Sequence, residues 1–256
     1  MNRRWFPLAA VALLLVLAAP GSAHAEGWVP TWNGLARSDD PREVATTLQV
    51  LLLLTVLTLA PTLIVMTTAF TRIVIVLSFL RQALATQQLP PNNILVGLSL
   101  ILTFLVMGPT FDRVKDQAVV PYMNSEITQA QAFDRAMVPM REFMFSQTRE
   151  KDLKLFLDLS KTKLLDREKV LREHIPTGVL VPAFVVSELR RAFIMGFAIF
   201  LPFVIIDLVV SCTLISMGML VLPPILISLP FKILLFVLVD GWHLLIGSLV
   251  HSFQVG

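Results

Sequence analysis

The chain has 256 residues, of which 55% are hydrophobic and only 15% charged, and its mean hydropathy is +0.76. A single water-soluble core of this size cannot bury so much apolar surface, so a soluble monomer is excluded and an all-α membrane protein is predicted. The formal net charge is +3, but most basic residues lie in one mixed-charge segment, which argues against nucleic acid as a partner. The only cysteine, Cys212, excludes intramolecular disulfides and multi-cysteine metal sites.

The N-terminus is typical of a secretory signal. Two arginines precede an apolar run at 8–19, a Pro-Gly pair breaks that run, and Ala23 and Ala25 form an A-x-A cleavage site. We predict a cleavable signal peptide at 1–25 and an N-terminal segment at 26–43; the alternative is a short uncleaved anchor. Either way the chain enters a secretory translocon, which favours the bacterial inner membrane.

A helix start is predicted at the end of this N-terminal segment. Asp40 is a suitable N-cap, Pro41 fits the first helical position, and Glu43 occupies the capping-box position. The run at 44–71 that follows is uncharged and longer than the ~20 residues that cross a bilayer.

Residues 44–111 are predicted to form a first hydrophobic helical hairpin. The helical pattern continues to 88, and Pro-Pro-Asn-Asn at 90–93 predicts a turn before a second uncharged run. Arg72 and Arg81 are expected near the tip of this hairpin, which places the tip on the cytoplasmic side by the positive-inside rule.

Residues 112–176 are predicted to form a soluble helical insert. About a dozen basic and eleven acidic residues nearly cancel there, and Leu153, Phe156 and Leu157 define one apolar stripe of a helix. A hairpin tip on the cytoplasmic side places this insert in the periplasm.

Residues 177–256 are predicted to form a second hydrophobic hairpin that carries charges at apolar positions. Such charges cost at least ~2.5–3.5 kcal/mol each at membrane depth, so they are expected to pair within protein. Lys232 is expected to meet Asp207 or Asp240, although Asp240 would lie about 12 Å from Lys232 along one helix and could pair only between helices or subunits. The predicted buried charge network comprises Arg72, Glu188, Asp207, Lys232 and Asp240.

The link between the two halves of this hairpin has no Lys or Arg from 208 to 231. A cytoplasmic loop that obeys the positive-inside rule would not look like this. Because irregular backbone at apolar depth is tolerated where it lines a protein cavity, we predict a helix-break-helix whose tip stays inside an assembly. The alternative is a tight loop between lipid-facing helices.

The sequence assembles no catalytic or metal-binding motif, so no enzyme, cofactor or metal is predicted. H-E-x-x-H, G-x-S-x-G and Walker sequences are all missing. His243 and His251 lie eight residues apart, whereas a two-ligand metal site prefers a spacing of four. Asp207 and Asp240 could serve an intramembrane aspartyl protease, but Asp240-Gly241 lacks the glycine motif that such enzymes carry.

Nine short segments form a recognisable series along the chain. They are TAFTRIVIVL at 68–77, RQALATQQ at 81–88, REFM at 141–144 with QTREKDL at 147–153, PAF at 182–184 with SEL at 187–189, FVIIDLV at 203–209, SLPFK at 228–232 and DGW at 240–242. In their order and spacing they resemble the FliP family of flagellar biosynthesis proteins, part of the type III secretion export gate. The injectisome branch of the same superfamily is the nearest competitor, and the signal peptide and the proline turn favour the flagellar branch.

The resemblance implies a homo-oligomer, expected to be a pentamer, in the inner membrane within the flagellar basal body. Its implied partners are FliQ-like, FliR-like, FlhB-like and FlhA-like proteins, membrane lipid, and the unfolded flagellar proteins that pass through the gate. It also implies a methionine-rich gasket around the closed pore, although this sequence lacks the family's consecutive methionines. The matching residues are Met217, Met219, Leu220, Val221 and Leu222.

Two other functions remain open at this level. An ion-coupled secondary transporter would use Asp207, Lys232 and Asp240 as a relay, but it would need internal repeats, and the two halves of the chain show none. A purely structural membrane scaffold is the third interpretation.

Overall fold

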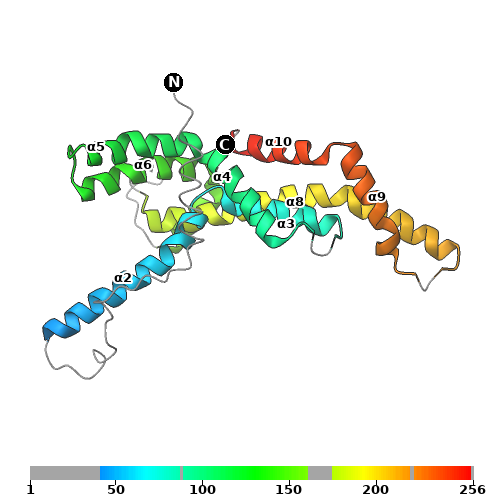
Figure 1. Cartoon of the computed structure of the whole chain (residues 1–256), viewed down its shortest axis with the longest axis horizontal. Coiled ribbons are helices and arrows are strands. Elements are labelled where there is room, and N and C mark those ends of the chain that lie inside the picture. Colours follow the sequence, from blue (N-terminus) through cyan, green and yellow to red (C-terminus); the bar gives the residue numbers. More distant parts are fainter. Residues whose placement is uncertain (1–40, 87–88, 161–174, 220–221, 255–256) are drawn as a thin grey trace, which may run out of the picture. The chain divides into compact units, whose positions relative to one another are not determined.

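The computed structural model describes residues 41–86, 89–160, 175–219 and 222–254, with only the backbone at 41–47 and 254. Every regular element in these ranges is a helix, which confirms the predicted all-α class (Figure 1). Ala23 and Ala25 of the predicted signal peptide lie outside the described residues, as does Asp40.

The chain divides into two units, residues 1–57 and 58–256. The first helix, α2 (Pro41–Met66), begins at the proline that the sequence placed in its first turn. Its described side chains in the first unit, 48–57, are exposed and mostly aliphatic. Their composition is that of a helix made to lie in lipid or against another apolar surface.

The helical pattern expected to run unbroken to 88 is interrupted after α2. The break covers 67–69, and the next helix, α3 (Phe70–Ala83), ends five residues before the predicted limit. At the break, Thr67 Oγ1 donates to the carbonyl of Leu63 at 2.9 Å and Thr68 Oγ1 donates to that of Val65 at 3.1 Å. Such local side-chain hydrogen bonds compete with the backbone ladder and help to end a helix.

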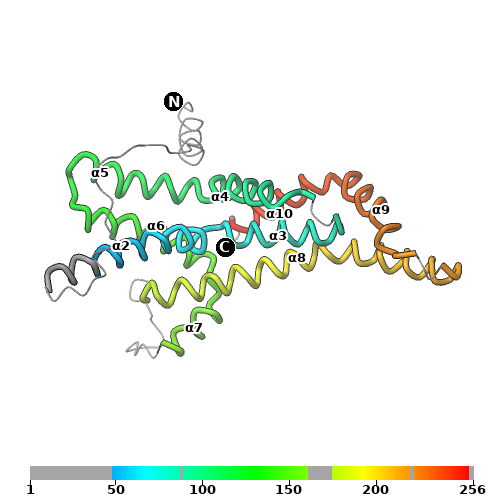
Figure 2. The backbone as a smooth tube through the Cα atoms, turned by 60° about the horizontal axis from the view of Figure 1, so that its bottom comes forward, coloured from blue at the N-terminus to red at the C-terminus, as the bar shows by residue number. Residues whose placement is uncertain are grey.

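The second unit is built around α3, which packs between α4 (Asn92–Val114) and α8 (Thr177–Ser216) (Figure 2). A Cβ at Gly196 of α8 would overlap the ring of Phe79 of α3, so this glycine permits the close approach of the two helices. The core residues are Ala69, Ile73, Val76, Leu77, Leu80, Ala83, Leu84, Leu95, Leu102, Met107, Ala192, Phe203, Leu245, Leu249 and Phe253.

The helix of the first hairpin continues without a break into the predicted insert. From α4 it passes through a π-helical turn, η2 (Lys115–Val119), and ends with α5 (Val120–Met123). α6 (Gln129–Gln147) starts at a Thr128 capping box and packs back along α4 and η2. The expected boundary at 111/112 therefore marks a change of composition within one helix.

α7 (Glu150–Leu159) packs on the first turns of α8. Its stripe of Leu153, Phe156 and Leu157 faces a second core cluster, as the sequence predicted. That cluster consists of Met144, Phe145, Ile175, Val179, Leu180 and Phe184.

The last hydrophobic stretch forms two helices, and the assumption of a single helix is wrong. α9 (Pro224–Leu238) and α10 (Gly241–Gln254) meet at a bend of 65°. Asp240 has a positive φ of 51° at the corner, and the ring of Phe236 occupies the place where a Cβ of Gly241 would lie. α10 then runs back to the core beside α3 and α4.

Among the described residues, three helical stretches are long and apolar enough to cross a membrane: Leu48–Met66, Asn92–Met123 and Thr177–Ser216. α9 and α10 make a fourth if the bent pair is one span. Only 11% of the most apolar part of α8 is buried within the chain. So much exposed apolar surface requires lipid or partner proteins around it.

Candidate functional site

Arg72 lies at the centre of a buried polar cluster where α3, α6, α8 and α10 meet. Its side chain and that of Glu188 are fully buried. Its Nε donates to Glu188 Oε2 at 2.9 Å, and its Nη2 donates to Oε1 of the same carboxylate. Nη1 donates to the Ser252 carbonyl and hydroxyl at 3.1 and 2.9 Å, and Nη2 also reaches Gln147 Oε1 at 2.9 Å. All five guanidinium N–H groups thus have acceptors, the condition for keeping this charge in an apolar core.

Gln147, the last residue of α6, joins this cluster to the end of the chain. Its Oε1 also accepts from Arg191 Nη1 at 2.6 Å, and its Nε2 donates to the Phe253 carbonyl at 3.1 Å. The Phe253 ring lies 3.7 Å from Arg72 Cζ, a cation–π contact. We call Arg72, Gln147, Glu188, Arg191 and Ser252 the arginine centre.

A second polar contact adjoins the arginine centre and holds α7. Asp152 accepts from Arg149 Nε at 2.8 Å and from Nη2 at 2.7 Å. Ser187, which precedes Glu188 in α8, donates its hydroxyl to Asp152 Oδ2 at 2.5 Å and accepts from the Arg149 backbone N–H at 3.1 Å. These bonds and the apolar stripe fix α7 against α8.

The other buried pair joins α8 to α9. Lys232, 3% exposed in its side chain, donates to Asp207 Oδ2 at 2.6 Å, and Ser228 donates its hydroxyl to Asp207 Oδ1 at 2.6 Å. Lys232 Nζ also donates at 3.2 Å to the carbonyl of Ala83, the last residue of α3. A cation is favoured there because the C-terminal carbonyls of a helix are left without helical partners and the helix dipole is negative. We call Lys232 and Asp207 the hairpin pair.

The tip between α8 and α9, residues 217–223, begins with a Schellman motif. Gly218 has φ +75°, its N–H donates to the Ile215 carbonyl at 3.0 Å, and the N–H of Met219 donates to the Leu214 carbonyl at 3.0 Å. This arrangement ends a helix at a left-handed residue, for which glycine is preferred. Met217, Met219 and Leu222 are exposed by 68%, 41% and 42%, so apolar side chains cover the described part of the tip.

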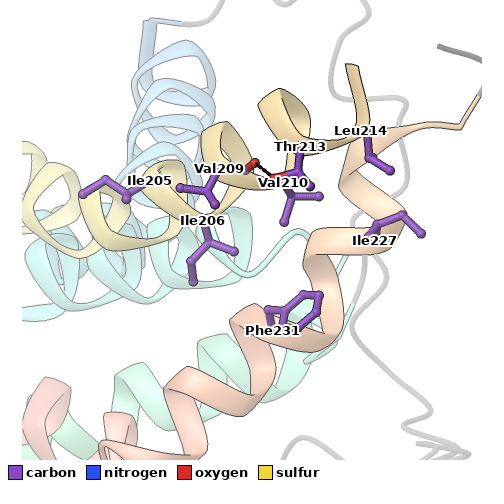
Figure 3. Close-up of a pocket in the computed structure, with 8 residues that line it drawn as sticks. All are labelled: Ile205, Ile206, Val209, Val210, Thr213, Leu214, Ile227 and Phe231. Carbon is purple, nitrogen blue, oxygen red and sulfur yellow. Dashed lines mark hydrogen bonds between the residues drawn. The ribbon is translucent and has the colours of Figure 1, made fainter. Parts of the chain in front are cut away.

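An open apolar groove runs along the facing sides of α8 and α9, from the level of the hairpin pair toward the tip (Figure 3). The Thr213 hydroxyl is turned back to the Val209 carbonyl at 2.8 Å and presents no polar group to the groove. The hairpin therefore leaves apolar surface of its own uncovered. The lining residues are Ile205, Ile206, Val209, Val210, Thr213, Leu214, Ile227 and Phe231.

Comparison with known proteins decides the family. A model described as the FliP family matches residues 53–249. The chain belongs to the FliP family. The flagellar biosynthetic protein FliP of Bacillus subtilis (strain 168) is 53% identical over 216 residues, which cover 84% of this chain and 96% of the relative. The protein of the same name from Caulobacter vibrioides (strain ATCC 19089 / CIP 103742 / CB 15) is 46% identical, over 96% of this chain and 91% of the relative. That from Aquifex aeolicus (strain VF5) is 47% identical, over 81% of this chain and 86% of the relative.

This finding confirms the resemblance that the sequence motifs carried. As a member of the FliP family with several helices apolar enough to span a membrane, the chain is a membrane-embedded subunit of the flagellar export apparatus. The FliP relatives give no support to the ion-coupled transporter considered as an alternative.

The structure pairs four of the five residues of the predicted charge network, in two separate places. Arg72 meets Glu188 and Lys232 meets Asp207. Arg72 was expected near a hairpin tip, but α3 packs along its length against α8 and buries this arginine. Asp240 lies at the corner after α9, eight residues beyond Lys232; it is exposed and makes no ion pair within the described ranges.

The tip residues are only partly described. Met217, Met219 and Leu222 lie on the exposed tip, whereas Leu220 and Val221 fall outside the described residues. Sequence reasoning assigned no role to Gln147, Ser228 or Gly218. Ser228 and Lys232 lie four residues apart on one helix face, a spacing that could have pointed to their shared partner. Gln147 is neutral and gave no charge signal.

Proposed function

We propose that this protein is a subunit of the protein-conducting gate of flagellar type III export, and that its α8–α9 tip closes the gate. Several copies, a pentamer in our proposal, surround one aperture through which unfolded flagellar proteins cross the inner membrane. The single observation that carries this function is the exposed apolar tip on a hairpin without Lys or Arg between 208 and 231.

The geometry of the hairpin supports a seal at the tip. A ring of identical copies would present Met217, Met219 and Leu222 from each copy to one small constriction, which blocks ions because it does not wet. Methionine is flexible and polarizable, so it suits a surface that must yield to passing chains of varied sequence. Leu220 and Val221 belong to the same proposed gasket.

The base of the same hairpin is held by the hairpin pair. Lys232 of α9 bonds both to Asp207 of α8 and to the Ala83 carbonyl at the end of α3. Motion of the tip could then occur without loss of the packing at the base. A fixed base and an exposed tip on the same hairpin support a gate that opens locally within a stable assembly.

The partners and the topology belong to the proposal as well. FliQ-like and FliR-like proteins would complete the conical gate, and FlhB-like and FlhA-like proteins would lie next to it. The exposed apolar faces of α8 and α9 and the open groove offer surface for such neighbours. The segment 112–176 would lie on the periplasmic side. Arg81 lies beside the turn after α3, and the positive-inside rule favours a cytoplasmic position for that turn.

The test replaces both Met219 and Leu220 by alanine. Loss of this side-chain volume should widen the closed aperture and raise ion conductance in the absence of export. The Schellman motif at Gly218 and the prolines Pro223 and Pro224 stay in place and preserve the hairpin. A matched control, Leu201→Ala with Leu208→Ala, removes the volume of two exposed leucines from α8 away from the tip. Conductance is recorded on the assembled complex in planar bilayers.

A leak in the tip variant and tightness in the control would support the proposal. A tip variant that assembles to the normal particle mass and stays tight would overturn it. A leak in both variants would also count against it, because the barrier would then depend on general packing of the helices.

A further inference from the structure

Two arginines of α8 carry charge that the rest of the described chain does not balance. The region holds four arginines: Arg72, Arg149, Arg190 and Arg191. Two carboxylates of the described chain bond to these arginines: Glu188 gives both oxygens to Arg72, and Asp152 gives both to Arg149. Two positive charges are left over.

The two remaining arginines, Arg190 and Arg191, are also accessible at the surface of the chain. Arg190 is exposed and forms no ion pair or side-chain hydrogen bond with any described residue. Arg191 is half-buried, and its one hydrogen bond within the described chain goes to neutral Gln147. Arg72 and Arg149 lie within electrostatic range of Arg191, so an anion placed there would be attracted by several arginines.

A row of exposed apolar side chains continues from these arginines along the same face of α8. The row consists of Phe193, Ile194, Phe197, Leu201 and Val204, exposed by 44–68%. Steps of three and four residues from Arg190 keep all of them on one side of the helix. The row extends about 16 Å at 1.5 Å per residue, close to the ~15 Å depth of one leaflet of a 30 Å hydrocarbon core.

We propose that Arg190 and Arg191 bind the phosphate of an anionic phospholipid whose acyl chain lies along this apolar row. Guanidinium groups present several N–H donors to phosphate oxygens, and basic residues beside membrane helices favour anionic headgroups. The surplus positive charge lies at one end of the apolar row. A phospholipid has the same arrangement, with its charged headgroup at one end of its acyl chains. The proposed site lies outside the tip and the hairpin pair and does not depend on which proteins are exported.

The test measures retained lipid on the purified complex by native mass spectrometry after reconstitution with phosphatidylglycerol or phosphatidylcholine. The wild-type complex should retain more phosphatidylglycerol than phosphatidylcholine. Arg190→Gln with Arg191→Gln should reduce this retention by roughly fivefold for each arginine removed. A control, Arg135→Gln with Lys151→Gln, changes the net charge equally at two exposed residues outside α8 and should leave retention unchanged.

Two further arms separate the sources of the anion. Phe197→Ser with Leu201→Ser should weaken phosphatidylglycerol binding and leave competition by inorganic phosphate unaffected, since these two exposed residues lie along the proposed acyl chain. If inorganic phosphate alone displaces all phosphatidylglycerol from the wild type, the site binds free phosphate and the lipid proposal is wrong.

Equal retention of phosphatidylglycerol by the double arginine variant and the wild type would also overturn the proposal. So would a photo-crosslinker at Ile194 that captures a second copy or another protein in place of lipid. Arg191 contacts Gln147, so the double variant could lose particle mass or helical circular dichroism. The single Arg190→Gln variant, which removes no intramolecular bond to a described residue, then decides the outcome by the same measurement.

Discussion

The arginine centre and the hairpin pair each contain an ion pair with a buried basic side chain, yet their surroundings differ. Four helices enclose the arginine centre, and both charged partners of its ion pair are fully buried. The hairpin pair joins the two helices of one hairpin, and the side chain of Asp207 is 33% exposed beside an open apolar groove. The first pair thus holds the body of the chain together, whereas the second leaves surface and charge available to neighbours in an assembly.

The strongest test of this difference is Arg72→Met. The substitution leaves a fully buried carboxylate without its cation and removes one hydrogen-bond partner of Gln147 and of Ser252, so we expect a loss of about 3–5 kcal/mol of folding stability. Thermal unfolding of the solubilised protein and its abundance in membranes measure the loss. Adding Glu188→Met should recover part of it, because neither charge of the buried Arg72–Glu188 pair is then left without its partner. A single variant as stable as the wild type would show that the centre is not structural.

Lys232→Met should have a smaller effect on the chain itself, about 1–3 kcal/mol, because Asp207 can reach water or a neighbouring subunit. We expect impaired assembly or export, measured as particle mass of the solubilised complex and as motility. Ser228→Ala is the control that removes one hydrogen bond to Asp207 and leaves its ion pair. An unchanged complex with full motility in Lys232→Met would contradict the proposed role of the hairpin pair.

Gly218→Ala tests the tip alone and should cost about 1 kcal/mol, because an L-residue is strained at this left-handed position. Hydrogen exchange at the end of α8 and thermal unfolding report the change. Gly247→Ala in α10 is the matched control with the opposite expected sign. Open space surrounds its Cβ position, and alanine should stabilise a helix interior by about 0.5–1 kcal/mol. Equal effects of both changes would mean that the turn at the tip is not under conformational constraint.

The sequence predicted those parts of the fold that depend on local chemistry. Pro41 begins α2, and the apolar stripe of α7 faces the core. The break at 67–69 and the corner at Asp240 were missed. Both lie in apolar runs whose helical periodicity continues past them, so hydropathy gave no sign of where the chain turns.

The sequence by itself determined the membrane class, the family and the list of charges that must be neutralised, because apolar run length and the cost of a charge at apolar depth are properties of composition. Only the tertiary structure decided the partners. Arg72 and Glu188 are 116 residues apart, and Asp207 and Lys232 lie on two helices joined by the tip. Asp207 meets Lys232 because the tip folds α9 back against α8, an arrangement that no local pattern predicts. Asp240 lies eight residues beyond Lys232, is exposed at the corner after α9 and takes no part in the hairpin pair.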